Sequence, residues 1–253
     1  MDMDKAKWRG NWQVERVPET GSTNADLLAG NSLDVPHRYV LTTAFQSAGK
    51  GRLGRVWEAP SGANLLMSVL LRNVAGPLHR VTQHLGLAAA LVLSEKYGLR
   101  AGVKWPNDVV VTVAREGGDV DVKIAGILAQ AAGNNVVVGM GLNVQWAPPP
   151  EVADATCMAA LLGAADVPEP IEMLDLVLAR FDDIGGLDER ESFALYRKHL
   201  HTLGKQVQCE MPDGSFVVGR AVDVGADGRL NVLDECAVTH HIDTADVMHL
   251  RLA

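Results

Sequence analysis

Apolar and polar positions repeat with two different periods along this chain, and each period predicts one kind of element. Apolar residues recur at helical spacing from Pro77 to Tyr97, where Gly98 is placed to end the helix, and again in segments 171–185 and 189–201. Short apolar runs predict strands, which cover 39–45, 65–71, 102–105, 109–113, 122–130 and 135–144. Helices mixed with hairpin-linked strands favour an α+β fold over a doubly wound parallel sheet.

Two N-terminal regions and one interrupted strand have a less regular pattern. Residues 1–21 show little of either period, whereas Ser22–Asn24 is typical of a helix cap before the apolar segment 25–29. Pro106 interrupts the strand that begins at Gly102, because proline cannot donate to a central ladder, and we expect that strand to continue from Val109.

The pattern changes after Gly204, where short strands replace the helices. Asp213-Gly214 and Asp227-Gly228 stand at the spacing of tight turns between strands at 206–209, 216–224, 229–233 and 237–242. This pattern indicates a small β-barrel. We therefore predict a larger domain, 1–203, and a small C-terminal domain, 204–253.

Composition adds limits on where the protein works and what it contacts. The 253 residues are 47% hydrophobic and 21% charged, which is ordinary for a globular protein that needs no disulfides. The charged first 12 residues do not resemble a signal peptide, and the longest apolar run, Leu85–Leu93, is too short to span a membrane. An odd number of widely spaced cysteines predicts a reducing, cytoplasmic location and argues against structural zinc: Cys157, Cys209 and Cys236.

Charge is distributed unevenly along the chain. The formal net charge of −8 argues against general nucleic-acid binding. Residues 35–94 nevertheless carry one acidic residue, Glu58, against six basic ones: Arg38, Lys50, Arg52, Arg55, Arg72 and Arg80. This basic stretch predicts either an anionic ligand or a set of solvated arginines.

The segment 46–55 is the first candidate for chemistry. Three glycines alternate with three cations between Gly49 and Arg55, so the backbone can bend closely around a ligand while the cations face it. This pattern suits a loop that orders over a phosphate or a carboxylate, although a mobile surface loop with solvated charges explains the motif alone equally well. It is not a P-loop, because GxxxxGK[ST] does not occur in the chain.

Three further motifs are individually weak. In the segment 104–108, Asn107 could contact a base or ribose and Asp108 a metal-bound phosphate, but a simple turn explains both. Lys123 opens an apolar strand, where a lysine normally extends to water unless it meets a buried anion. The segment 139–143 is not a dinucleotide fingerprint, because Val144 stands where a third glycine is needed, yet its glycines predict a strand passing close to a ligand.

Six motifs in a fixed order, between residues 14 and 145, resemble the biotin protein ligases. The matching blocks are 21–24, 46–57, 62–65, 104–108, 123–128 and 139–143. The resemblance implies a mixed β-sheet catalytic domain flanked by helices, of the class II synthetase and biotin–lipoate ligase type. The C-terminal strands are similar to the small SH3-like domain of that family.

The resemblance also implies a reaction and a set of residues for it. Biotin and ATP, with Mg²⁺, would give biotinyl-5′-AMP and pyrophosphate, and biotin would then pass to a lysine of a biotin carboxyl carrier domain of a biotin-dependent carboxylase. Lys123 and Arg52 would be catalytic, and no residue is assigned as a Mg²⁺ ligand. The biotin-binding positions would be Ser22, Thr23, Asn24, Gln46, Lys50, Gly51, Arg52 and Lys123. The nucleotide-binding positions would be Arg55, Trp57, Asn107, Asp108 and Asn143.

Some features depart from that family. The loop has Lys50 where many relatives have arginine, which keeps the charge but loses the fork geometry. The stretch 109–122, which contains Asp121, is longer than the usual compact turn, so we expect a long exposed hairpin without a chemical role. We also expect His201 to be solvated.

Only 21 residues precede Ser22, so we expect no helix-turn-helix domain and no repressor function. Two alternatives remain open from the sequence. One is a lipoate or octanoate protein ligase of related fold, and the other is a biotin-sensing, DNA-binding regulator. The block 104–108 together with the loop 49–55 favours biotin over lipoate.

Overall fold

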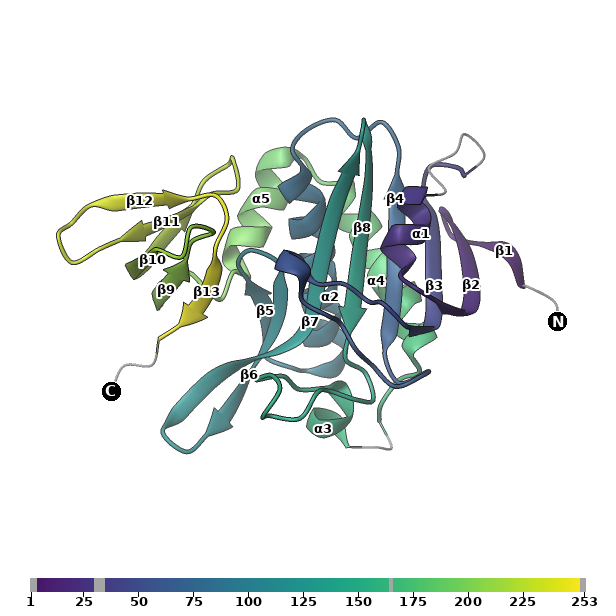
Figure 1. Ribbon diagram of the computed structural model, residues 1–253, viewed down its shortest axis with the longest axis horizontal. Coiled ribbons are helices and arrows are strands. Elements are labelled where there is room, and N and C mark those ends of the chain that lie inside the picture. The colour runs from purple at the N-terminus through teal and green to yellow at the C-terminus, as the bar shows by residue number, and fades with distance from the viewer. Residues whose placement is uncertain (1–3, 30–34, 164–165, 251–253) are drawn as a thin grey trace.

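The computed structural model describes residues 4–29, 35–163 and 166–250, which form two β-sheets and the helices around them (Figure 1). The helices are α1 (Thr23–Ala29), α2 (Leu78–Tyr97), α3 (Met158–Leu162), α4 (Pro170–Gly185) and α5 (Glu189–Lys198), with a short 3-10 helix at Arg52–Gly54. The strands are β1 (Asp4–Arg9), β2 (Trp12–Thr20), β3 (Tyr39–Gln46), β4 (Leu65–Leu71), β5 (Ala101–Lys104), β6 (Asp108–Arg115), β7 (Gly118–Ala132), β8 (Asn135–Leu142), β9 (Gln206–Glu210), β10 (Phe216–Val224), β11 (Leu230–Leu233), β12 (Thr239–Ile242) and β13 (Asp246–His249).

The larger sheet has eight strands in the order β1-β2-β3-β4-β8-β7-β6-β5. Strands β2 and β3 run parallel, and the other neighbouring pairs are antiparallel. Helices α2 and α4 pack together against the back of the sheet as it is drawn in Figure 1, and α1 lies in front of β4 and β8. On the front face, α1 contacts β3, β4 and β8.

Helix α2 forms the centre of the core and shows why the prediction from periodicity succeeds. Its residues from Leu85 to Leu93, apart from a glycine, are apolar and almost fully buried, so the helix is covered on nearly every side. Gly98 takes a left-handed conformation with φ 66° and donates its backbone N–H to the last turn, which ends the helix as expected. Helices α4 and α5 each begin with a capping box, at Glu169 and Asp188 respectively.

Two expectations about strands are wrong. The first 21 residues are not irregular, because β1 and β2 extend the sheet and Trp12 is buried against α4, where its Nε1 donates to Asp182 at 3.0 Å. The strand before Pro106 does not continue after it: β6 folds back antiparallel to β5, so Val103 pairs with Val109. Both errors concern pairing between strands, which the local pattern of a strand does not specify.

The smaller sheet is antiparallel, with the order β12-β11-β10-β9-β13. The turns at 213–214 and 227–228 lie where the sequence predicts them, with left-handed Gly214 and Gly228. Strand β13, which the sequence analysis missed, is an edge strand paired with β9. The second sheet begins shortly after the predicted boundary at residue 203, and the division into two domains stays a prediction.

Candidate functional site

A pocket of about 880 Å³ opens beside the N-terminus of α1, between the front of the large sheet and β13. Its walls come from α1, strands β3 to β8, the loop 46–57, the segment 146–155 and the small sheet. All of the residues that the sequence analysis named line it: Ser22, Thr23, Asn24, Gln46, Lys50, Gly51, Arg52, Arg55, Trp57, Asn107, Asp108, Lys123 and Asn143. The fold thus brings five separate motifs to one cavity, while the role of each residue stays a prediction.

One end of the pocket is a buried network of uncharged polar groups. The backbone N–H of Thr23 donates to Gln46 Oε1 at 2.9 Å, and Thr23 Oγ1 lies 2.6 Å from Ser68 Oγ. Ser68 donates to Asn24 Oδ1 at 2.6 Å, and Asn24 Nδ2 donates to Gln130 Oε1 at 2.9 Å. Because each of these groups is held by its neighbours, this end presents fixed donors and acceptors to a neutral polar ligand.

The sequence analysis missed Ser68 and Gln130 as members of this network. Ser68 is the one polar residue in the apolar run of β4, and it is fully buried. A lone serine inside an otherwise apolar strand was the signal that could have identified it, since buried hydroxyls need hydrogen-bond partners. Gln130 had no comparable signal, because its contact with Asn24 joins residues 106 positions apart.

The middle of the pocket floor is flat because two glycines face each other there. Gly126 on β7 pairs with Gly141 on β8, and the indole ring of Trp57 lies against both. A Cβ atom at Gly141 would come within 2.3 Å of the ring, and one at Gly126 within 2.9 Å. Trp57 Nε1 is buried and has no hydrogen-bond partner in the described structure, so no hydrogen bond from Nε1 helps to hold the ring in place.

The other end of the pocket is cationic. Lys123 Nζ lies 2.7 Å from Asp108 Oδ1 and 5.5 Å from the centre of the Trp57 ring. Lys104, which the sequence analysis did not assign to the site, also lines the pocket. Burial lowers the pKa of Lys104, an effect that the nearby Asp108 carboxylate opposes. The lysines and arginines at this end could bind an anionic ligand, while the pocket lining also carries carboxylates, among them Asp108, Asp121 and Asp246.

The loop 46–57 closes the pocket from the side of the small sheet. Leu53 takes a left-handed φ of 54°, and the Gly51 N–H donates to the Arg55 carbonyl at 2.7 Å, so the loop folds back on itself. Arg52 Nη1 donates to Asn107 Oδ1 at 3.2 Å and to the carbonyl of Ala245 at 3.4 Å. Burial lowers the pKa of Arg52, although the carboxylates of the surroundings oppose this. Its guanidinium is therefore partly withdrawn from water.

Two further contacts join the loop and the strand ends to their surroundings. Arg55 forms an ion pair with Asp246 at the start of β13. Asn143 accepts a hydrogen bond from Asn64 at 3.2 Å and donates to the carbonyl of Thr156 at 3.0 Å. Asn64 is buried in the loop before β4, and its side-chain Oδ1 accepts hydrogen bonds from the backbone N–H groups of Val144 and Trp146, which helps to fix the position of Asn143.

Comparison with known proteins identifies the family that this chain matches and one of its relatives. Residues 15–145 match the biotin/lipoate A/B protein ligase family. A biotin–[acetyl-CoA-carboxylase] ligase of Mycobacterium tuberculosis is 38% identical over 255 aligned positions, which cover 96% of this chain and 90% of that protein.

Solved structures show the same architecture. A biotin protein ligase from Aquifex aeolicus in complex with biotin and ATP superposes with a TM-score of 0.78 at 24% identity, covering 94% of this chain and 99% of that one. A mutant of that ligase in complex with biotin gives a TM-score of 0.77 at 25% identity, covering 94% of this chain and 98% of that one. The α+β fold class with a small second sheet, expected from the sequence, is confirmed. No helix in the described ranges is long and apolar enough to cross a membrane.

Proposed function

The chain belongs to the biotin/lipoate A/B protein ligase family, and we propose that it acts as a biotin–[acetyl-CoA-carboxylase] ligase. The observation that carries the proposal is a single pocket with two unlike ends, one buried and uncharged around Asn24 and the other cationic around Lys123. A ligand with a neutral polar ring and an anionic tail would satisfy both ends, and the phosphates of ATP would fit the second.

Biotin would bind with its ureido group at the uncharged end and its carboxylate toward the cations. The residues proposed to contact the ring are Ser22, Thr23, Asn24 and Gln46, of which the first three are almost fully buried. Their fixed hydrogen bonds favour a ligand that both donates and accepts, as a cyclic urea does. Lys50 and Gly51 would cover the valerate chain from the loop.

ATP would bind at the other end. Trp57 offers a flat aromatic face for the adenine, and Asn107 and Asp108 lie at the tight turn between β5 and β6, where they can meet ribose or phosphate oxygens. Arg55 and Asn143 complete the proposed nucleotide side.

The first step of the proposed reaction joins two anions. The biotin carboxylate attacks the α-phosphorus of ATP, pyrophosphate leaves, and biotinyl-5′-AMP remains. Fixed cations are needed to offset the repulsion and to stabilise the charge that develops at phosphorus. Lys123 and Arg52 are proposed for this role, because both line the pocket and neither is fully solvated.

The second step transfers the biotinyl group. The ε-amine of a carrier lysine attacks the carbonyl carbon of the mixed anhydride, AMP leaves, and an amide forms. Until the carrier arrives the anhydride must be kept from water, which the loop 46–57 would do by closing over it. The proposed partner is therefore the carrier domain of a biotin-dependent carboxylase.

Mg²⁺ is proposed to enter with ATP. The described residues hold no cluster of three side chains of the kind that encloses a metal ion. Mg²⁺ commonly takes only one or two carboxylates and completes its shell with phosphates and water, and Asp108 offers such a carboxylate beside Lys123. Bound there, the ion would neutralise phosphate charge.

We also propose a cytoplasmic location. The three cysteines are all unpaired, which fits a compartment where thiols stay reduced.

One assay tests the proposed function against its alternatives. The protein is incubated with ATP, Mg²⁺, an apo carrier domain and either biotin or lipoate, and the intact mass of the carrier is measured. A biotin-sized increase supports the proposal. An increase with lipoate alone would overturn it in favour of a lipoate ligase. Biotin-dependent binding to specific DNA at physiological salt, without any change in carrier mass, would instead indicate a regulator.

A further inference from the structure

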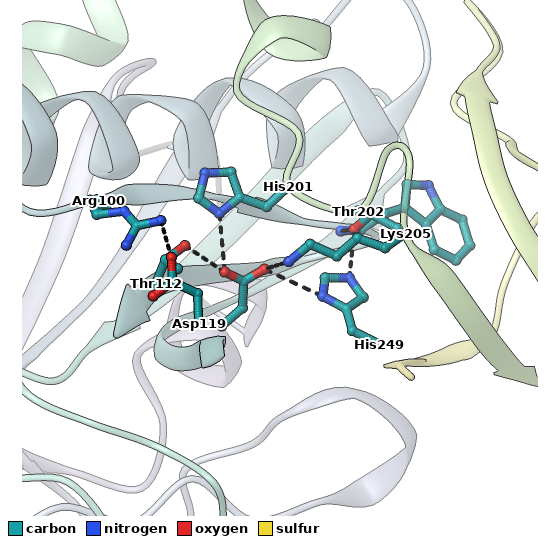
Figure 2. Close-up of polar contacts among 9 residues, drawn as sticks. Arg100, Thr112, Asp119, His201, Thr202, Lys205 and His249 are labelled. Atoms are coloured by element: carbon teal, nitrogen blue, oxygen red, sulfur yellow. Dashed lines mark hydrogen bonds and ion pairs between the residues drawn. The ribbon is translucent and has the colours of Figure 1, made fainter. Parts of the chain in front are cut away.

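Asp121, in the hairpin of β6 and β7, is a buried carboxylate rather than the exposed residue that the sequence led us to expect. Its side chain is 2% exposed and accepts a hydrogen bond from Thr112 Oγ1 at 2.6 Å. His201 Nδ1 and His249 Nδ1 each lie 3.4 Å from its oxygens, and Lys205 forms an ion pair with it. Figure 2 shows Thr112, His201, Lys205 and His249 converging from different parts of the chain.

These partners belong to three separate segments. Thr112 is on β6 of the large sheet, His201 and Lys205 lie between α5 and β9, and His249 is the last residue of β13. Burial alone would raise the pKa of Asp121, but hydrogen bonds from all four partners lower it well below its usual range. The carboxylate therefore stays charged, and a buried charge that depends on four fixed partners holds those partners in one arrangement.

Strand β13 connects this carboxylate to the loop over the pocket. Its last residue, His249, contacts Asp121, and its first residue, Asp246, pairs with Arg55. The preceding carbonyl, of Ala245, accepts a hydrogen bond from Arg52. As an edge strand, β13 has a sheet neighbour on one side, β9, so contacts outside its sheet have a large share in fixing its position.

We propose that Asp121 is a positioning residue that holds β13 in place, so that β13 in turn keeps the arginines of the loop 46–57 closed over the pocket. A closed loop should slow the loss of biotinyl-5′-AMP from the enzyme, and this consequence rests on the proposed function. Asp121 is itself one of the residues that line the pocket, and the proposed route of its effect runs through His249 and Asp246. The hairpin 109–122 thereby gains a role that its sequence did not suggest.

Other contacts keep the small sheet attached when Asp121 is altered. Trp105 donates from its backbone N–H to Thr202 Oγ1 at 2.9 Å and from Nε1 to the carbonyl of Gly228 at 2.9 Å. Removal of the Asp121 charge should therefore loosen β13 without separating the two sheets, and the change should be confined to the loop and its neighbours.

The test compares Asp121→Asn with Asp119→Asn, a matched control on the same strand. Asp119 carries an exposed ion pair with Arg100, which lies just before β5 of the large sheet. Amide hydrogen exchange of residues 46–57 is measured without substrates, and the lifetime of biotinyl-5′-AMP on the enzyme is measured after a single turnover. For Asp121→Asn we expect both exchange and adenylate loss to rise about tenfold, within the usual range of coupling between sites, with biotin KM unchanged within about twofold. Asp119→Asn should behave as the unaltered protein.

A double variant tests the route of the effect. If Asp121 acts through Asp246, then Asp121→Asn should add little to the loop exchange already caused by Asp246→Ala. Fully additive effects would overturn the proposed route. Should Asp121→Asn fail to fold, Lys205→Gln removes one partner of the same carboxylate from a side chain that is 37% exposed, and should raise loop exchange in the same direction.

The outcomes separate this inference from the proposed function. Unchanged loop exchange in both Asp121→Asn and Lys205→Gln would overturn the positioning role, even if the protein transfers biotin. Raised loop exchange in a protein that forms no adenylate would support the positioning role and overturn the proposed function.

Discussion

Two glycines on the same face of β8 lie beneath different ends of the pocket, so substituting each of them should affect a different substrate. Gly139 lies beneath the uncharged end, where an added Cβ would come 2.2 Å from Asn24 Oδ1 and 3.2 Å from Ser68 Oγ. Gly141 lies beneath the Trp57 ring, where an added Cβ would come within 2.3 Å. The contacts with Asn24 and with the Trp57 ring are each more than about 1 Å shorter than a comfortable van der Waals separation, so alanine at either position must displace its neighbour.

Gly139→Ala should weaken biotin binding. The displaced Asn24 would lose its hydrogen bond from Ser68 and strain those it donates to Leu128 and Gln130, all of them in the buried network. One buried polar group left without a partner costs about 1–3 kcal/mol. If that cost falls on the bound state, biotin KM rises roughly 5- to 150-fold, while the KM for ATP stays within about twofold.

Gly141→Ala should instead weaken the binding of ATP and leave the binding of biotin little changed. The half-buried Trp57 ring can tilt away from the new methyl group, so the cost is at the lower end of the roughly 1–3 kcal/mol typical of overpacking. The KM for ATP should then rise about tenfold with biotin KM little changed.

Steady-state kinetics with each substrate varied in turn measures both variants, and thermal unfolding reports their stability. Gly185→Ala is the control, because a Cβ there meets no atom within 4 Å and alanine suits the end of α4. The reasoning is refuted if Gly139→Ala and Gly141→Ala raise the same KM, or if neither KM changes in proteins that remain folded.

Three further predictions follow from the cationic end and from the buried histidines. Lys123→Ala should slow adenylate formation by about 10²-fold or more, as for other preorganised charges, and near-normal pyrophosphate release would contradict its role. Arg52→Ala, which removes the contacts with Asn107 and Ala245, should shorten the lifetime of biotinyl-5′-AMP on the enzyme, and an unchanged lifetime would reject the closed-loop argument. Burial lowers the pKa of His84 and His249 below 6.5, so the unfolded chain takes up protons more readily than the folded one as the pH falls through that value. The thermal midpoint should therefore fall between pH 8 and pH 5, and a midpoint that rises would refute this.

Local chemistry explains what the sequence predicted well. Helix α2 could be predicted because its apolar residues repeat at helical spacing and Gly98 can take the left-handed conformation that ends it. The loop 46–57 could be predicted because alternating glycines disfavour a long helix or strand, and it contains only the short 3-10 helix Arg52–Gly54. The turns at 213–214 and 227–228 follow from the same rule, and the family was recognisable because its motifs keep their order.

Contacts between distant residues explain what the sequence analysis missed. Asp121 looked like one acid among several in an exposed hairpin, and its burial depends on His201, Lys205 and His249, which lie about 80 or more positions away. Likewise, β2 gave no clear signal because its partner β3 and the side chain that binds Trp12 come from elsewhere in the chain.

The sequence by itself determined every helix except the short α3, as well as the turns at 213–214 and 227–228, the order of the motifs and hence the family, because propensity, capping and spacing act between near neighbours. Only the tertiary structure decided which strands pair and how β13 reaches the loop 46–57. It also decided which charges are buried. A side chain's free energy depends on whether water or protein surrounds it, and that surrounding is built from residues that the chain itself keeps far apart.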